Sequence, residues 1–421
     1  MTNIFIKTYG CTLNQSDSEL MAGLLKQAQF NIVDNIEDAF IIIINTCTVK
    51  SPSDNKFFNY LKEIKEKYPY KKIIITGCIP QTAPEKIKKY PLVGTSQITD
   101  IVSVVEEILH ENIISSLAVE NNPRLNLPKI RKNPIVEIVP ICAGCLGNCS
   151  YCIVKKARGR LVSYPKEEII KQIKTALDEN VKEIWLTAQD TGCYGKDINT
   201  NLIELLKEII LIKGDFKIRL GMLNPNHALE FIDELIEIYK NPKMFKFIHL
   251  PLQSGSDKIL KLMKRKYTAE DFENIIKKFK QNIPDITIAT DIIVGFPEEN
   301  EHDFNSSVFL IRKITPDILN ISKFWLRPGT EAEKLEQVKG DIIKKRSNFI
   351  TDIFHNIARM QNERWLNWKG KIIIEDKKQN WIGRNYAYKQ VILDGDFSLG
   401  QEFNVLIKKI TPFYLMGQII T

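Results

Sequence analysis

Residues 145–152 read Cys-Leu-Gly-Asn-Cys-Ser-Tyr-Cys, and this stretch decides the fold of the chain. It puts three thiols, those of Cys145, Cys149 and Cys152, in one short loop. Three thiolates hold three irons of a cubane iron–sulfur cluster and leave the fourth iron open. A structural zinc site needs a fourth protein ligand, for which Cys142 is the nearby candidate. The spacing favours an iron–sulfur cluster with one open iron.

Downstream of this loop, apolar and β-branched runs alternate with segments of helix length. The runs lie at 183–187, 217–220, 247–250, 287–294 and 318–324. Repeated strand-then-helix spacing is typical of a parallel sheet that closes fully or partly into a barrel. A helical pattern over 341–368 follows the last run. We expect a partial (βα) barrel domain over residues 135–368.

The N-terminal part has the same alternation and a second set of cysteines. Strand-like runs at 3–7, 40–44 and 72–75 alternate with helical patterns at 16–29 and 53–68, for which Ser16 and Ser53 are the predicted N-caps. This predicts an open α/β sheet over residues 1–122. Strand carboxyl ends meet at one edge of such a sheet, so the cysteines that follow the three runs can meet there. They are Cys11, Cys47 and Cys78. Free cysteines are also common core residues, and spacing alone leaves that alternative open.

Two further segments complete the chain. Residues 120–140 interleave four prolines with basic residues, which predicts a linker. Residues 369–421 contain short strand-like runs separated by glycines, which predicts a small antiparallel β-barrel.

Composition sets broad limits on these predictions. The chain has 421 residues, a net charge of +8 and eight cysteines. No apolar run approaches the length that spans a bilayer, so we expect a cytoplasmic protein without a membrane partner. Thiols in that compartment stay reduced, which favours metal ligation over disulfides. Cys142 and Cys193 belong to neither triplet, and the sequence assigns them no role.

The loop at 145–152, with Tyr151 before its last cysteine, resembles the signature of radical S-adenosylmethionine enzymes. In that family the open iron chelates the amino and carboxylate groups of S-adenosylmethionine, whose reductive cleavage yields a 5′-deoxyadenosyl radical. The resemblance implies that Tyr151 lies near the adenine. A packing role is the alternative for this ring.

The surroundings of the three N-terminal cysteines closely resemble the methylthiotransferase family, and the resemblance continues over nearly the whole chain. Further blocks follow in the family's order at 157–159, 188–192, 250–256, 290–297 and 327–330. In this family the N-terminal cysteines hold an auxiliary [4Fe-4S] cluster that carries the sulfur to be transferred. The resemblance implies two [4Fe-4S] clusters, S-adenosylmethionine, a reductant and a sulfur donor.

Polar residues at the ends of the predicted barrel strands are candidates for S-adenosylmethionine contacts, because a buried pocket needs hydrogen-bonding groups. These candidates are Gln189, Gln253, Ser254 and Asp291. The sequence has Thr-Ala-Gln-Asp at 187–190 where many radical enzymes have Gly-Gly-Glu. This departure leaves open how the methionine amino group is held.

The substrate prediction rests on resemblance to one branch of the family. Residues 144–146, 156–159, 163–165, 263–267 and 288–293 resemble the archaeal and eukaryotic branch, which converts N6-threonylcarbamoyladenosine at tRNA position 37 to its 2-methylthio derivative. Isopentenyladenosine in tRNA and an aspartate of a ribosomal protein are the alternative substrates. A threonylcarbamoyl group carries a carboxylate, and Lys155, Lys156 and Arg158 are candidate cations for it. Solvated charges are the alternative reading.

The C-terminal barrel resembles the TRAM domain, an RNA-binding module. It interleaves charge with aromatic rings at Trp381, Arg384, Tyr386 and Tyr388, so we expect Arg384 to contact tRNA. The non-enzymatic alternative is an iron–sulfur scaffold that binds RNA. A purely structural cluster has all four irons bound by protein, whereas each triplet here lacks a fourth ligand.

Overall fold

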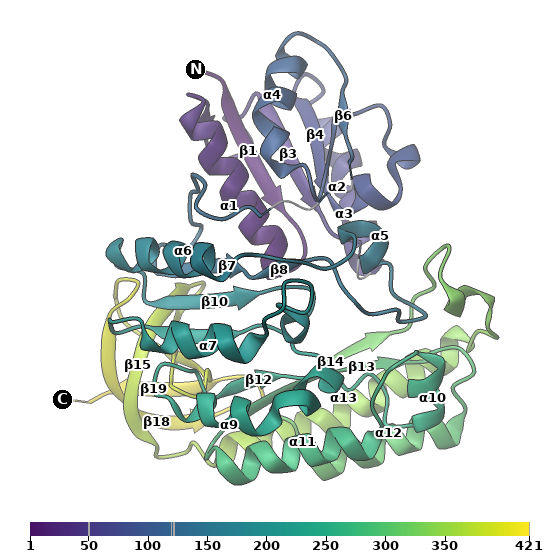
Figure 1. Cartoon of the computed structure of the whole chain (residues 1–421), viewed down its shortest axis with the longest axis vertical. Helices are drawn as coiled ribbons and strands as arrows, with labels where there is room; N and C mark the ends of the chain where they lie inside the picture. The colour runs from purple at the N-terminus through teal and green to yellow at the C-terminus, as the bar shows by residue number, and fades with distance from the viewer. Residues whose placement is uncertain (49–50, 119, 121–122, 421) are drawn as a thin grey trace.

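The computed structural model describes residues 1–48, 51–118, 120 and 123–420 (Figure 1). Asn121, Asn122 and with them the predicted domain boundary at 122 lie outside these residues. Three sheet systems follow one another along the chain: a six-stranded sheet, a half barrel and a small closed barrel. None of the helices in the described ranges has the length and apolar character required to cross a membrane.

The N-terminal sheet is parallel throughout, with strand order β2-β1-β3-β4-β5-β6. Its strands are β1 (Asn3–Thr8), β2 (Asn31–Ile32), β3 (Ile41–Thr46), β4 (Lys72–Gly77), β5 (Leu92–Gly94) and β6 (Ser115–Ser116). Successive isoleucines of β3 alternate between two apolar cores, one on each face of the sheet. Helices α1 (Thr12–Gln27) and α4 (Ile101–Leu109) cover one face, and α2 (Ser51–Lys67) covers the other. A central strand buried on both faces is typical of a parallel α/β sheet, as predicted.

The predicted N-caps of the first two helices are wrong. Helix α1 begins at Thr12 with Cys11 in the cap position, and Ser16 is buried within the helix. Helix α2 begins at Ser51, so Ser53 lies inside it. The chain turns at Gly10, whose φ is +110°, and enters α1 immediately after the cysteine. Cys11 is therefore fixed at the start of a helix rather than in a free loop.

The central domain is a half barrel of six parallel strands. In order these are β7 (Val136–Pro140), β10 (Glu183–Thr187), β11 (Lys217–Leu220), β12 (Phe247–His249), β13 (Thr287–Val294) and β14 (Ile318–Lys323). A parallel bridge between Ile218 and Met244 joins its two three-stranded parts. The partial barrel is as predicted. The predicted linker is wrong for its last five residues, because Val136–Pro140 is the first barrel strand and is fully buried.

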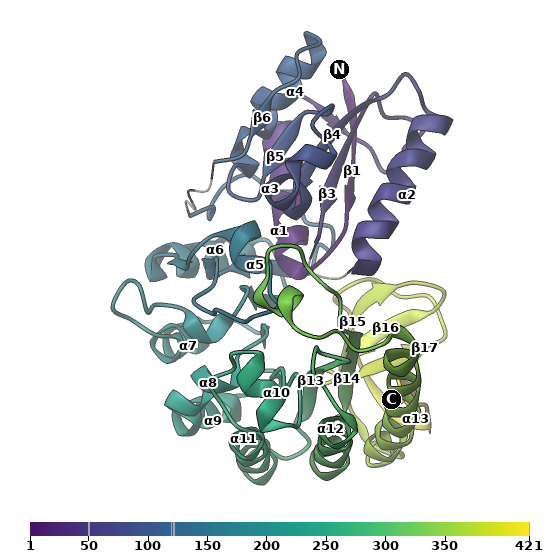
Figure 2. The ribbon, with the colours of Figure 1, turned by 90° about the vertical axis from the view of Figure 1, so that its right-hand side faces the viewer.

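Helices cover the outer face of the half barrel (Figures 1 and 2). The long ones are α6 (Lys166–Asp178), α7 (Leu202–Leu211), α9 (Ile232–Lys240), α11 (Ala269–Asn282), α12 (Glu301–Ile314) and α13 (Gly340–Glu363). The short ones are α8 (Pro225–Ala228) and α10 (Asp257–Leu262). Two more short helices lie elsewhere: α3 (Cys78–Thr82) in the N-terminal domain and α5 (Val154–Arg158) after the cysteine loop. A small hairpin of β8 (Cys142–Ala143) and β9 (Val162–Ser163) encloses the cysteine loop at 145–152. Helix α5 lies between the N-terminal sheet and the half barrel and packs against α3.

The C-terminal part forms the predicted small barrel, closed in the order β15-β16-β17-β19-β18. Its strands are β15 (Lys369–Lys377), β16 (Trp381–Arg384), β17 (Gln390–Leu393), β18 (Glu402–Ile410) and β19 (Leu415–Ile419). Four of its strand pairs are antiparallel, and the pair of β17 with β19 is parallel.

One side of this barrel packs against the half barrel through aromatic rings. The Tyr388 ring lies 4.8 Å from that of Phe245 and 5.1 Å from that of Phe247, between ring centroids. Tyr388 and Trp381 are both buried. The expectation that these two rings form a stacking surface for RNA is therefore wrong. Phe245 and Phe247 of the half barrel cover Tyr388, whereas Trp381 is buried in the core of the small barrel itself.

Arg384 and Tyr386 also take part in this interface. The Arg384 guanidinium forms an ion pair with Glu375 and lies 4.4 Å from the centroid of the Tyr388 ring. The Tyr386 hydroxyl donates a hydrogen bond of 2.8 Å to Asp285 in the half barrel. The charge of Arg384 is thus compensated within the protein, which counts against its predicted contact with tRNA.

The interface predicts a pH-dependent stability. Burial, followed by repulsion from Glu375, raises the pKa of Glu183 to about 8, above the value of about 4.3 expected in the unfolded chain. The folded state binds the proton of the Glu183 carboxyl more tightly than the unfolded chain does. The stability that this protonated carboxyl contributes is therefore present at low pH and is lost as pH rises towards 8. We expect Glu183→Gln to keep the Trp185 hydrogen bond and to lose less stability than the native chain between pH 5 and pH 8.5.

Thermal unfolding at the two pH values measures this difference. Glu237→Gln, a change at an exposed position of α9, is the matched control and should follow the native chain. A Glu183→Gln variant whose melting temperature runs parallel to the native one across the range would contradict the assignment.

Candidate functional site

The loop that carries Cys145, Cys149 and Cys152 is shaped around Gly147. A Cβ added at this glycine would lie 3.3 Å from the Cys145 Sγ and 3.7 Å from the Cys149 Sγ, so two of the sulfurs flank it. The Gly147 amide donates a hydrogen bond of 3.2 Å to the Cys145 Sγ. The Cys152 amide donates one of 3.1 Å to the Cys149 carbonyl. The sequence spacing thus gives one compact loop with its sulfurs gathered near a residue that has no side chain.

Neighbouring segments fix the loop from both sides. The Ser150 hydroxyl donates a hydrogen bond of 2.6 Å to the Leu262 carbonyl, and the Ser150 carbonyl accepts one of 2.9 Å from the Ala332 amide. At the start of the loop, Gly144 has a φ of +77°. A Cβ there would lie 1.9 Å from the Arg160 carbonyl oxygen. The hairpin can close over the loop only with glycine at this position.

Burial acts strongly on the thiols of this loop. It raises the pKa of Cys145 to about 12 and that of Cys152 to about 11. A thiol must lose its proton to become a metal ligand, so the cations nearby matter. Arg265 and Arg327 both lower the pKa of Cys152 through their charges. The sequence analysis gave neither arginine a role, although both lie in blocks that it noted.

Tyr151 is half-buried behind the loop and holds Arg265. Its hydroxyl and the Arg265 Nη2 are 2.6 Å apart, and its ring meets the Phe296 ring edge to face at 6.0 Å between centroids. The Arg265 Nε is buried and has no hydrogen-bond partner among the described residues. The packing alternative for Tyr151 is thus realised, and its predicted contact with adenine stays a prediction.

The four predicted strand-end residues differ in what they offer. The Oε1 of Gln189, just after β10, is buried with no hydrogen-bond partner in the described part of the chain. Asp291, on β13, binds the His249 Nε2 at 2.9 Å and the Asn320 Nδ2 at 2.7 Å. Ser254 is fully buried, with its hydroxyl 3.3 Å from that of Ser307, so its environment is a packed one.

Gln253 differs from these three because its backbone is engaged. Its φ is +70°, its amide donates a hydrogen bond of 2.8 Å to the Asp291 carbonyl, and its carbonyl accepts one of 2.9 Å from Ile293. This bends the chain beside β13. Gln189 and Asp291 remain the two candidates with polar atoms at the carboxyl ends of the strands.

The three N-terminal cysteines lie at one edge of their sheet, as predicted. Cys47 directly follows β3, Cys78 directly follows β4, and Cys11 follows β1 by three residues. The three strands are neighbours in the sheet. A Cβ on Gly10 would lie 2.6 Å from the Cys47 Cβ, which brings the first two cysteine loops into contact. The charges of Cys11 and Cys78 also influence one another.

No three histidine, cysteine or acidic side chains within the described ranges are grouped as a single metal ion requires. In a cubane each thiolate binds a different iron. The Gly147 cradle between two sulfurs and the partnerless Gln189 oxygen are the features that fit a cluster with a bound amino-acid group.

The two remaining cysteines share one acceptor. Cys142 and Cys193 are both buried, and their Sγ atoms lie 3.9 Å and 3.0 Å from the Asp190 carbonyl oxygen. Cys193 ends a short 3-10 turn, Thr191–Cys193. The structure gives both thiols a packed environment near the loop.

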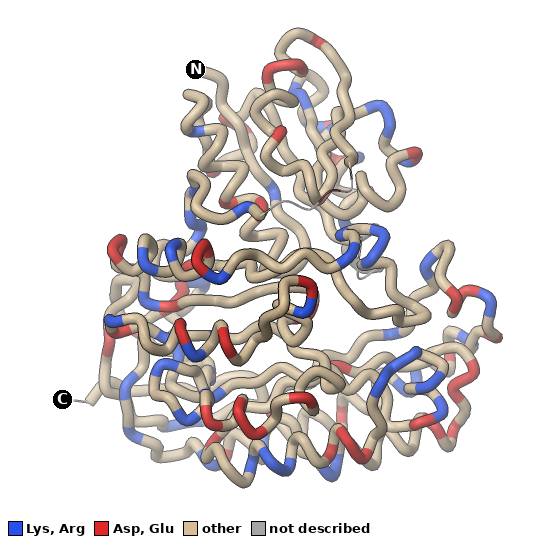
Figure 3. The backbone as a smooth tube through the Cα atoms, viewed as in Figure 1, with Lys and Arg blue, Asp and Glu red and all other residues tan. Residues whose placement is uncertain are grey.

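The three cations of helix α5 have different surroundings. Arg158 is 3% exposed and its Nη1 binds the Asp17 Oδ2 at 2.8 Å. This counts against its predicted contact with a substrate carboxylate. The Lys155 Nζ donates a hydrogen bond of 2.7 Å to the Asn148 Oδ1, and Lys156 is exposed. In Figure 3 this helix is a blue segment between the N-terminal sheet and the half barrel.

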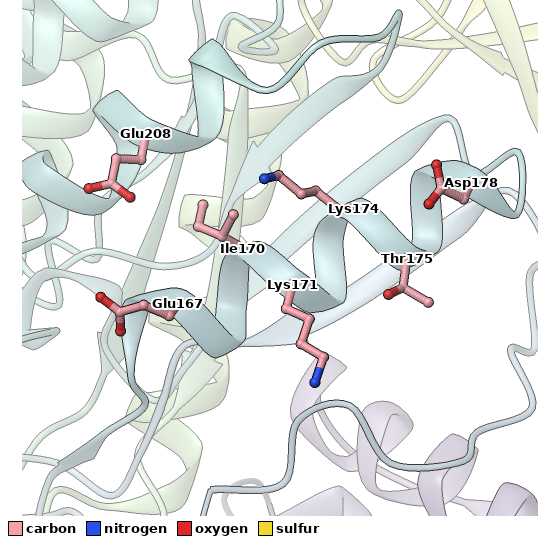
Figure 4. A pocket seen from close by; sticks show the side chains of 7 residues that line it. All are labelled: Glu167, Ile170, Lys171, Lys174, Thr175, Asp178 and Glu208. Atoms are coloured by element: carbon pink, nitrogen blue, oxygen red, sulfur yellow. The ribbon is translucent and has the colours of Figure 1, made fainter.

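A surface hollow of about 450 Å³ lies elsewhere, on the outer side of α6 (Figure 4). Its lining consists of Glu167, Ile170, Lys171, Lys174, Thr175, Asp178 and Glu208. None of these residues belongs to either cysteine triplet or to the strand-end candidates. The hollow is thus separate from the candidate site at the carboxyl ends of the strands.

Known proteins resemble this chain in sequence and in fold. The family model of the Radical SAM superfamily matches residues 139–311, and the model described as uncharacterized protein family UPF0004 matches residues 3–95. The methyltransferase TsrM from Kitasatospora setae, solved with cobalamin and a [4Fe-4S] cluster bound, superposes with a TM-score of 0.58 at 12% identity, over 79% of this chain and 74% of that one. The half barrel and the loop at 145–152 define a radical S-adenosylmethionine enzyme, a class that uses an iron–sulfur cluster and S-adenosylmethionine.

Full-length relatives identify the family. The chain is 43% identical to the probable threonylcarbamoyladenosine tRNA methylthiotransferase of Pyrococcus abyssi, over the whole length of both proteins. It is 38% identical to the threonylcarbamoyladenosine tRNA methylthiotransferase of Homo sapiens, over 99% of this chain and 73% of that protein. The chain belongs to the threonylcarbamoyladenosine tRNA methylthiotransferase family. The resemblance noted from the cysteine contexts is confirmed, and the reading as a non-enzymatic scaffold is wrong.

The geometry of Gly144 predicts a cluster-loading defect. In Gly144→Ala the new methyl group meets a backbone carbonyl, and a positive φ costs an alanine roughly 1 kcal/mol or more. We expect the hairpin to open and the loop at 145–152 to lose its iron. Gly214→Ala is the matched control, because Gly214 also has a positive φ but its nearest contact, the Phe216 Cδ1, is 3.7 Å away.

Iron content per chain after reconstitution measures the effect. The control should load as the native chain does. Full iron loading in Gly144→Ala would show that the hairpin does not depend on this glycine.

Proposed function

We propose that this enzyme converts N6-threonylcarbamoyladenosine at position 37 of tRNA to its 2-methylthio derivative. The observation that carries the proposal is the full-length match to relatives of that name, combined with two cysteine triplets at the carboxyl edges of adjoining parallel sheets. Such edges are where α/β folds bind ligands.

The cofactors proposed are two [4Fe-4S] clusters and S-adenosylmethionine. Cys145, Cys149 and Cys152 would hold the cluster of the radical reaction, and the auxiliary cluster would be held by the N-terminal triplet, Cys11, Cys47 and Cys78. When bound, these groups supply the radical that removes a hydrogen atom from the base and the sulfur that replaces it. The part of the protein is to orient the reacting groups and to exclude water.

Residues around the radical loop have matching chemistry for S-adenosylmethionine. The partnerless Oε1 of Gln189 can accept a hydrogen bond from the methionine amino group, in the role that the Gly-Gly-Glu motif has in other radical enzymes. The buried Nε of Arg265 is a donor for the methionine carboxylate. Tyr151 keeps the orientation of Arg265 through its hydroxyl. Asp291, on β13, is the further contact proposed.

The substrate contacts proposed lie on the exposed side of the same edge. Lys156 is exposed at α5 and can bind the carboxylate of the threonylcarbamoyl group. Trp325, which follows β14 and is 55% exposed, offers a ring for base stacking. The sequence analysis missed Trp325, although it stands two residues before the block at 327–330.

The proposal also divides the chain into three domains, at 1–122, 135–368 and 369–421. It includes three partners: tRNA, a reductant and a sulfur donor. The C-terminal barrel would act as the TRAM-like domain. Its exposed lysines, rather than its buried rings, would contact the tRNA backbone; they include Lys377, Lys378, Lys408 and Lys409. A reductant and a sulfur donor complete the reaction.

The substrate assignment predicts a selective product. The reconstituted, reduced enzyme is given S-adenosylmethionine and one of three tRNAs that differ only at position 37: threonylcarbamoyladenosine, isopentenyladenosine or unmodified adenosine. We expect a 2-methylthio product with the first alone, because its carboxylate pairs with a cation whereas an isopentenyl group needs an apolar wall.

Nucleoside mass spectrometry identifies the product, and 5′-deoxyadenosine release reports the radical step. The unmodified tRNA is the control for background. A methylthiolated isopentenyladenosine in place of the expected product would assign the enzyme to another branch of the family. Absence of 5′-deoxyadenosine with all three tRNAs would contradict the radical reaction itself.

A further inference from the structure

The Arg158 guanidinium is buried beside the N-terminal cysteine triplet. It stands at the end of α5, six residues after Cys152, and is 3% exposed. Its Nη1 binds the Asp17 Oδ2 at 2.8 Å, and its Nη2 donates a hydrogen bond of 2.8 Å to the Asn14 Oδ1. Both partners lie in α1, the helix that starts at Cys11. Arg158 thus connects the segment after the radical loop to the segment after the first auxiliary cysteine.

Asn14 extends this connection to the other cysteine loops. Its Oδ1 also accepts a hydrogen bond of 3.4 Å from the Cys11 Sγ. Its Nδ2 donates to the Thr46 carbonyl at 2.7 Å and to the Tyr9 carbonyl at 3.1 Å. Thr46 directly precedes Cys47. A single amide therefore contacts two of the three N-terminal cysteine loops and also binds Arg158.

The two arginines at Asp17 carry more positive charge than its single carboxylate balances. The Asp17 carboxylate binds a second buried guanidinium, since the Arg124 Nη1 lies 3.2 Å from its Oδ1. Two arginines thus share one carboxylate. Arg158 also interacts with the Cys78 thiol by charge and by hydrogen bond, and with Cys11 by charge. Buried charges need compensation, and thiolates at Cys11 and Cys78 would provide it.

We propose that Arg158 is a positioning residue that provides the positive charge beside the auxiliary cluster, raises the reduction potential of that cluster, and fixes it relative to the radical loop. The proposal rests on the auxiliary cluster of the proposed function. It gives Arg158 a role in place of the substrate contact expected from the sequence.

The direction of the effect follows from electrostatics. Reduction adds an electron to a group that already carries the negative charge of three thiolates. A cation beside it favours the reduced form, and hydrogen bonds to sulfur act in the same direction, so both raise the potential. The effect is large in a buried site because screening there is weak.

The test is a redox titration of the reconstituted full chain followed by electron paramagnetic resonance. Added S-adenosylmethionine changes the signal of the radical cluster and so separates it from that of the auxiliary cluster. We expect Arg158→Gln to shift the auxiliary cluster to a more negative potential, while the radical cluster in the same sample keeps its own. Arg158→Lys should retain most of the native potential, because it keeps the charge.

Arg124→Gln is the matched control. It removes the same charge from the same carboxylate, but Arg124 binds the other oxygen and the Thr95 carbonyl. It should leave the auxiliary potential close to the native value. An unchanged potential in Arg158→Gln, or equal shifts in Arg158→Gln and Arg124→Gln, would overturn the proposal.

Two further outcomes have a clear meaning. If Arg158→Gln does not assemble the auxiliary cluster, assembly in Arg158→Lys supports the role of the charge, and failure of both variants overturns it. The iron content of the native chain is measured first. Iron for one cluster alone would contradict the proposed function, independently of any result at Arg158.

Discussion

The ion pair between Arg158 and Asp17 joins two parallel sheets that are otherwise separate along the chain. The paired atoms are 2.8 Å apart and both side chains are buried. One residue lies just after the radical loop and the other lies in the helix that begins at an auxiliary cysteine. Leaving one partner of a buried pair uncompensated typically costs about 3–5 kcal/mol. This contact therefore constrains how the two cysteine triplets can move relative to each other.

Both cysteine triplets lie at the carboxyl edge of a parallel sheet. The N-terminal triplet stands at the carboxyl edge of β1, β3 and β4, and the radical loop follows β7 and β8 at the edge of the half barrel. Open α/β sheets and barrels place their sites at these edges because the loops there can vary without disturbing the core. Helix α5 lies between the N-terminal sheet and the half barrel.

Much of this could be predicted from the sequence, since cysteine spacing and strand periodicity are local signals. The loop of Cys145, Cys149 and Cys152, the half barrel and the small barrel were predicted in this way, whereas the N-terminal triplet was assigned by its resemblance to the methylthiotransferase family. The failures concern contacts between distant residues. Arg158 was taken as a substrate cation because its partner Asp17 lies 141 residues away. Tyr388 was taken as an exposed ring because its partners belong to another domain.

Smaller errors have local causes. The predicted linker ran into β7 because proline at 134 and 140 suggested irregular chain, although Pro140 ends a strand. The first helix was predicted to start at Ser16, whereas Leu13 is already buried in it. Arg265 carried no spacing signal, and only the structure shows its contact with Tyr151.

The central claim is that two separate cysteine triplets each hold one cluster. The most direct test compares Cys145→Ala/Cys149→Ala/Cys152→Ala with Cys11→Ala/Cys47→Ala/Cys78→Ala by iron content and electron paramagnetic resonance. We predict that each triple variant keeps about half of the native iron and one of two distinct cluster signals. Loss of all iron in either triple variant would contradict the assignment of one cluster to each triplet. Full iron in Cys11→Ala/Cys47→Ala/Cys78→Ala would contradict it as well.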